Sequence, residues 1–282
     1  MKLFCATIIR MHRETESLEF PVDDFHREVI EIILRGSFAG RSSAISAVRH
    51  LNLAWHLRST DAQMAMLRSI TAKEEAATAL FRVLQDRRYP DHSKLRPRNH
   101  LHKNAILPFV EVVARVWELR GGLVPSWALV IEDAETSRAR LRLVFDIETA
   151  GGDVSYVKPM PPLNFEFSRW SPVAATLVRE DFQDGVDAVI SDQRVKEIIE
   201  YLSVCANDRN LLLYASEHNP AAMPNNIAEQ LTDHQWAVLL ILKLYVMIAP
   251  YPQHQLFVRQ ALAAFIRMIT RVTNEPQPVT TA

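Results

Sequence analysis

Apolar residues recur at three- and four-residue spacing over most of the chain, which is the period of an amphipathic helix. The spacing predicts an antiparallel pair of helices over 41–86, broken by a short turn near residue 60. Ser42 or Ser43 has the side chain to cap the first of them. Thr232, followed three residues on by Gln235, forms a capping-box pattern that opens a later helix. The remaining predicted helices span 99–119, 180–206, 233–249 and 254–273.

Between these helical stretches the apolar period changes to two. "SRARLRLVFDI" and "LNFEFS" alternate polar and apolar residues, which is typical of half-buried antiparallel strands. With "WALVI" before them and a Gly151-Gly152 turn, the pattern predicts a three- or four-stranded meander over about 127–170. The predicted fold class is therefore mainly α (α+β), an antiparallel helical bundle with a small β-meander inserted between its N-terminal and C-terminal helices.

The change of period also suggests domain boundaries. We expect an N-terminal segment and helical core over 1–120, the β-meander insertion over 121–178, and C-terminal helices completing the bundle over 179–274. Residues 275–282 are expected to form a flexible tail. The first residues, "MKLFCATIIRMHRE", are predicted to be a strand or helix of the fold rather than a leader.

Composition adds little about function. The chain has 282 residues, is 48% hydrophobic and has a net charge of −1, so bulk charge favours neither nucleic acid nor a membrane surface. Cys5 and Cys205 form no disulfide framework, which favours the cytoplasm. The most apolar stretch, 236–249, stops at Pro250 and is shorter than the roughly 20 residues of a spanning helix. We expect a core helix there and no membrane.

Two predicted helices place titratable groups where an apolar residue is expected. At 100° per residue, His102 falls within the apolar arc of 99–119, whereas His100 falls on the polar side. Pro108 either kinks this helix or marks its true start. In the preceding helix Lys73 lies near the centre of the apolar face, with Glu74 on its flank. These residues are functional candidates, although a hydrogen-bonded core histidine and a snorkelling lysine are the structural alternatives.

Other patterns exclude several chemistries. The sequence has no glycine-rich phosphate loop, no G-x-S-x-G, no H-E-x-x-H and no C-x-x-C, so we expect no cofactor. His100 and His102, two residues apart, suit a metal on a strand better than on a helix, so we expect no metal. Arg138, Arg140 and Arg142 share one strand face, which is more typical of a solvated sheet face than of a phosphate site.

Two stretches taken in order resemble the HEPN superfamily, especially its AbiV-like branch associated with abortive phage infection. They are "SAISAVRHLNLAWHLRSTDAQMAMLRSITAKEEAATALFRVL" and "RPRNHLHKNAILPF". Members have paired helices, a glutamate pair late in the second, here Glu74 and Glu75, and a later helix with a basic start, here 96–103. Residues 209–214 are similar to a short Arg-to-Tyr segment of the same branch. The resemblance covers about 40–119 and that short segment.

HEPN ribonucleases pair an arginine with a histidine that has four to six residues between it and the arginine, usually with a polar residue directly after the arginine. Arg96 has five residues between it and His102 but is followed by proline, whereas Arg98 is followed by the polar Asn99 but has only three residues between it and the histidine. Arg87 and His92 also have the spacing. The resemblance therefore implies catalysis by His102 with Arg96, Arg98 and Asn99, supported by Lys73, Glu74 and His100.

The chemistry that the resemblance implies is metal-independent RNA cleavage by a homodimer. In it the RNA 2′-hydroxyl attacks the adjacent phosphorus, His102 transfers a proton, and an arginine stabilises the phosphate charge. The predicted strand block has no counterpart in the minimal HEPN bundle and could sense a trigger, contact a protein partner or cover the site.

Two alternatives stay open at this point. The first is a non-catalytic helical interaction protein that uses the same bundle to bind a protein or RNA partner. The second is a small-molecule enzyme that uses the surroundings of Lys73 and Glu74.

Overall fold

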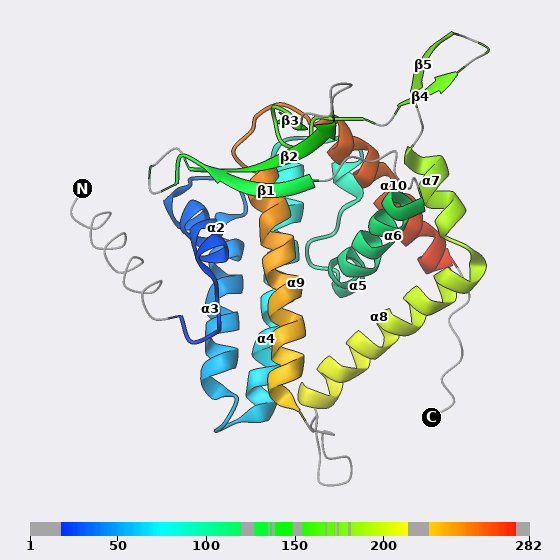
Figure 1. Cartoon of the computed structure of the whole chain (residues 1–282). Coiled ribbons are helices and arrows are strands. Elements are labelled where there is room, and N and C mark those ends of the chain that lie inside the picture. Colours follow the sequence, from blue (N-terminus) through cyan, green and yellow to red (C-terminus); the bar gives the residue numbers. More distant parts are fainter. Residues whose placement is uncertain are drawn as a thin grey trace. The chain divides into compact units, whose positions relative to one another are not determined.

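The computed structural model describes residues 18–119, 127–134, 136, 139–148, 154–166, 168–171, 173, 175–179, 182–213 and 226–274. The fold is mainly helical with a small antiparallel sheet, which confirms the predicted α+β class (Figure 1). The HEPN-like bundle and the domain boundaries at 120 and 178 stay predictions. The expectations for 1–17, Gly151-Gly152, Arg138, Tyr214 and 275–282 lie outside the described residues.

Contacts between residues divide the chain into two compact units, and each unit is made of three separate segments of the sequence. The first comprises 1–83, 131–141 and 207–250, and the second comprises 84–130, 142–206 and 251–282. In the first unit, α2 (Asp24–Arg35), α3 (Arg41–Leu57) and α9 (Ile227–Ile248) pack against one another. Most of α4 (Ala62–Asp86) belongs to the same unit.

A close approach fixes where α3 begins. Gly40 is its N-cap and has φ +80°, and a Cβ at this position would lie 2.5 Å from the Ala79 carbonyl oxygen on α4. Only glycine satisfies both the left-handed backbone and the contact. The expected cap at Ser42 or Ser43 is therefore wrong, because the helix starts before either serine and has no side-chain cap.

Helix α2 is not among the helices predicted from the sequence. Its capping pattern is visible in the sequence, since the Asp23 side chain accepts a hydrogen bond from the His26 amide at 2.8 Å. Val29, Ile30 and Ile33 are fully buried and form its inner face. Phe25, Val29, Ile32 and Ile33 recur at three- and four-residue spacing, so the periodic signal of this helix was present in the sequence.

The second unit is built around helices α6 (Ile106–Leu119), α7 (Phe182–Val189) and α10 (Leu256–Asn274), which pack against one another. Phe109 of α6 meets Phe265 of α10 edge to face, with 5.4 Å between ring centroids. A second aromatic cluster, in which rings pack edge to face or stacked, is formed by Trp117, Phe145, Phe165, Phe182 and Phe257.

The long helices predicted over 99–119 and 180–206 are each divided. The first becomes α5 (His100–Asn104) and α6, so that Pro108 falls in the first turn of α6, where a missing amide costs no helical hydrogen bond. The second becomes α7 and α8 (Asp192–Leu213), with a break at 190–191. Helix α8 also continues through 207–213, beyond the predicted end of the helix at residue 206.

The predicted meander is only partly correct. Strands β1 (Trp127–Glu132), β2 (Arg140–Glu148) and β3 (Val154–Val157) form a three-stranded sheet in that order, with Phe145 opposite Val157. "LNFEFS" is not a strand over 163–166, where Phe165 instead joins the aromatic cluster. A separate hairpin pairs β4 (Ser168–Ser171) with β5 (Thr176–Arg179).

The expected solvated face of β2 is wrong for Arg142. Its side chain is buried, and the guanidinium donates a hydrogen bond to the Tyr251 hydroxyl at 2.8 Å. The same guanidinium lies 5.8 Å from the centre of the Tyr251 ring, a cation–π distance. Arg140 is exposed, as expected. Alternation alone gave no sign that an aromatic residue more than 100 positions away covers one of these arginines.

Helix α9 is longer than predicted. It begins at Ile227, where Asn226 caps the Glu229 amide at 3.3 Å, so Thr232 lies inside the helix and the predicted capping box is wrong. With 22 residues, α9 is long and apolar enough by length and composition to cross a membrane, and 56% of its most apolar window is buried in the structure. The length argument against a spanning helix therefore fails, and the expected absence of a membrane stays a prediction.

Candidate functional site

The basic strip at 96–104 lies in the second unit, at the start of α5. Asn99 is the N-cap of this five-residue helix, and its side-chain oxygen accepts hydrogen bonds from the amides of Leu101 at 2.8 Å and His102 at 3.3 Å. Asn99 is therefore a capping residue that sets the direction in which α5 leaves the connector. It holds the backbone of His102 in place.

The strip separates exposed cations from a buried imidazole. Arg96, Arg98 and His100 are exposed, whereas His102 is only 7% exposed. This confirms the predicted inward orientation of His102 and outward orientation of His100. Lys103 is also buried, which helical rotation did not single out.

His102 is electrostatically unusual. Burial lowers its pKa below the ordinary value of 6.5, and the positive charge of Arg96 acts in the same direction. Its Nδ1 atom is buried and has no hydrogen-bond partner among the described residues. The imidazole is therefore neutral near pH 7 and has an unused polar atom, so it is chemically able to accept a proton.

Of the two candidate arginines, Arg96 is the one whose charge acts on His102. No direct hydrogen bond joins either Arg96 or Arg98 to the imidazole in the described part of the chain. Both arginines are exposed, and among them only the charge of Arg96 acts on His102. Which arginine pairs with His102 stays a prediction.

The supporting residues Lys73 and Glu74 lie on α4, in the first unit. Lys73 is 9% exposed and Glu74 is 6% exposed, which confirms that the helix carries charged groups on its buried side. Their role beside the strip stays a prediction. Their own surroundings, however, contain a polar contact that was not anticipated.

Ser69, one turn before Lys73, is fully buried and meets His234 of α9, with 2.6 Å between Oγ and Nδ1. The Ser69 hydroxyl also donates to the Met66 carbonyl at 2.8 Å, so we assign the proton of the first contact to Nδ1, which donates to Oγ. Burial, followed by the charge of Lys73, lowers the pKa of His234 to about 3. The sequence shows that Ser69 and Lys73 lie one helical turn apart on the same face of α4. It does not show that His234 on α9 is the partner of Ser69.

Within the part of the chain that the structure describes, no group of three or more His, Cys, Asp or Glu side chains could hold a metal ion. Searches against protein-family models, curated proteins and solved structures found no match to this chain. The candidate function therefore depends on the geometry of the strip and on the resemblance stated above.

Proposed function

We propose that this chain is a HEPN-like endoribonuclease that cleaves RNA without a metal ion and acts as an abortive-infection effector against phage. The observation that carries the proposal is the neutral, buried His102 with an unpartnered Nδ1 in the field of the exposed Arg96. A neutral imidazole accepts the proton of a 2′-hydroxyl, and an exposed guanidinium binds the adjacent phosphate. We further propose that the active form is a homodimer, as the resemblance implies.

The direct test is RNA cleavage by the purified full-length chain in the presence of EDTA. His102→Ala should lower the rate by about 10²- to 10⁴-fold, the usual contribution of a proton-transfer group. Arg96→Ala should lower it by about 10²-fold, and Arg98→Ala by less. Arg82, an exposed arginine on α4, gives the matched control Arg82→Ala, which should leave the rate unchanged.

The pH profile adds a second readout. If His102 is the general base, the rate should rise with pH through a pKa below 6.5 and then level off. In bacteria, expression of the parent chain should slow growth and reduce phage plating, and His102→Ala should remove both effects. Equal growth with both chains, together with no RNA cleavage by either, would contradict the proposal.

The burial of His102 favours a second candidate, a non-catalytic helical protein that binds a protein or RNA partner through the exposed Arg96, Arg98 and His100. This candidate predicts that labelled RNA is retained but remains intact. Charge reversal at Arg96 and Arg98 would then weaken retention, whereas His102→Ala would not change it. The β-sheet, for which sensing a trigger, contacting a partner and covering the site were all left open, would be the second contact surface.

A further inference from the structure

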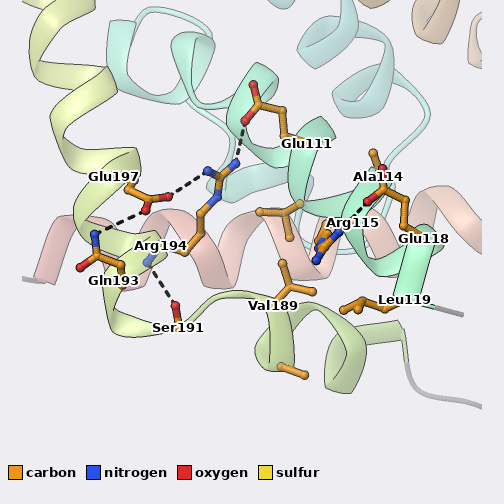
Figure 2. Close-up of a pocket in the computed structure, with 12 residues that line it drawn as sticks. Glu111, Ala114, Arg115, Glu118, Leu119, Val189, Ser191, Gln193, Arg194 and Glu197 are labelled. Atoms are coloured by element: carbon orange, nitrogen blue, oxygen red, sulfur yellow. Dashed lines mark hydrogen bonds and ion pairs between the residues drawn. The ribbon is translucent and has the colours of Figure 1, made fainter.

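A cavity of about 660 Å³ opens in the second unit, among α6, the end of α7 and the first turns of α8 (Figure 2). Its charged side chains are paired with one another. Arg194 donates to Glu111 at 2.6 Å and to Glu197 at 3.0 Å. Arg115 donates to Glu118 at 2.9 Å. Because these charges are matched within the lining, the cavity indicates no ligand of either charge.

Helix α9 in the first unit has an apolar surface that its neighbours leave partly uncovered. Trp236 is 60% exposed, and among the described residues of the first unit it is the one large apolar side chain that is exposed. Leu240 and Leu244, one and two turns further on, are half-buried. These three residues, here called the α9 stripe, span roughly 12 Å along the helix axis. Exposed apolar surface of this kind is typical of a docking site.

The described chain begins beside the α9 stripe. The side-chain amide of Gln235, the residue before Trp236, donates a hydrogen bond to the Pro21 carbonyl. Two residues earlier, the Glu19 amide donates to the Asn52 side chain on α3. Residues 1–17 therefore join the described chain close to the stripe. Six residues of extended chain, 12–17, reach up to about 20 Å, which is enough to bring 1–11 onto it.

The first eleven residues, "MKLFCATIIRM", have the pattern of an amphipathic helix. At 100° per residue, Met1, Phe4, Cys5 and Ile8 fall within one arc of about 100°. Ala6 falls on the opposite side, together with the lysine and the arginines of the segment. A helix with this pattern needs an apolar surface of two or three turns to cover its arc, and the α9 stripe has that length.

We propose that residues 1–11 dock on the α9 stripe as an amphipathic helix of the same chain, with the apolar arc against Trp236 and Leu240. Asp233 is exposed one turn before Trp236, so the flank of the stripe complements the basic side of the segment. The link at Leu18 gives the segment a high local concentration that a separate partner lacks. The inference goes beyond the proposed RNA cleavage and does not depend on it.

Disulfide trapping in the full-length chain tests the docking, because Cys5 lies on the apolar arc. In a Cys205→Ser background, Leu240→Cys adds a thiol on the stripe. The matched control Arg49→Cys adds one at an exposed position on α3, one turn from Asn52. With oxidised glutathione, the Leu240→Cys chain should form the intramolecular disulfide at least about tenfold faster than the control. A freely moving segment would reach both thiols at similar rates, since both lie near the start of the described chain.

The fluorescence of Trp236 gives a second readout that needs no added cysteine. Its contribution is the emission that is lost in Trp236→Phe. Ile8→Asp places a charge in the apolar arc, so it should shift this emission to longer wavelength and increase its quenching by acrylamide. Ala6→Asp places the same charge on the opposite side of the segment and should leave both quantities unchanged.

Several results would overturn the proposal. Equal rates of disulfide formation in Leu240→Cys and Arg49→Cys would show that the segment has no preference for the stripe. A disulfide that forms only between chains would assign the stripe to a second copy of the protein. Equal quenching of Trp236 in the parent and in Ile8→Asp would show that the segment does not cover it. Melting temperatures identify a misfolded variant, and Asp233→Cys, at an exposed position, replaces Leu240→Cys if that variant does not fold.

Discussion

The polar groups on α4 and those at the start of α5 are buried in two different ways. Ser69 on α4 meets His234 and a backbone carbonyl, so its hydroxyl group is fully used inside the first unit. His102 on α5 is nearly as buried, but its Nδ1 atom has no partner among the described residues. A satisfied polar contact in a core stabilises the fold, whereas an unsatisfied one costs free energy.

The largest expected effect is a loss of stability in acid through His234. Its pKa in the folded chain, about 3, lies below that of an unfolded histidine, so between about pH 6.5 and 3 the unfolded chain binds more protons. The stabilisation is therefore complete above about pH 6.5 and should fall by about 1 kcal/mol per pH unit as the pH decreases. Urea unfolding at several pH values measures it, and His234→Asn should flatten the profile. An unchanged slope in that variant would assign the acid sensitivity elsewhere.

Ser69→Ala should destabilise the chain by about 1–3 kcal/mol, because the His234 ring loses its buried acceptor. Thr71→Ala is the matched control on the same helix. The Thr71 hydroxyl is half-buried and donates only to the Leu67 carbonyl one turn back, so its loss should cost less than about 1 kcal/mol. Similar losses for both variants would show that the contact with α9 adds no stability.

Removing the cap of α5 tests how firmly the strip is held. Asn99→Ala leaves the amides of Leu101 and His102 without their side-chain acceptor and should cost about 1 kcal/mol in unfolding free energy. Asn99→Asp retains an acceptor and should recover most of that stability. Loss of RNA cleavage in the alanine variant with recovery in the aspartate variant would assign Asn99 a positioning role.

His102→Leu distinguishes the two kinds of buried polar group most directly. Because it removes an imidazole with an unpartnered nitrogen, the variant should unfold with the same free energy as the parent or about 1 kcal/mol more, while RNA cleavage is lost. His100→Leu, at the exposed neighbouring position, should change stability by less than about 0.5 kcal/mol. Strong destabilisation by His102→Leu would show instead that the imidazole is a structural group.

The smallest effect concerns the pairing of Arg96 with His102. Arg96→Gln removes the positive charge that helps to lower the pKa of His102, so that pKa should rise toward its ordinary value while burial still holds it below. Arg98→Gln should leave it unchanged. Histidine titration by NMR measures both, and an equal rise in the two variants would contradict the assignment of Arg96.

The sequence predicted most of what depends on one helix at a time. The apolar spacing placed α3, α4 and α10 within a few residues, and rotation by 100° per residue oriented His100 and His102 correctly, because a helix repeats every 3.6 residues whatever covers it. It failed at helix caps and breaks. The start of α3 at Arg41 was predicted correctly, but its cap is Gly40, in close approach to Ala79, rather than a serine, and the break before α8 has no proline or glycine to mark it.

Features that join distant segments were decided only by the tertiary structure. Arg142 was expected in solvent but is covered by Tyr251, and Ser69 finds its imidazole partner 165 positions away on α9. The cavity beside Glu111 likewise requires α7 and α8 to meet α6. Local periodicity determines which side of a helix is apolar. Burial and pKa, however, depend on which other segment covers that side, and in this chain those segments are far apart in the sequence.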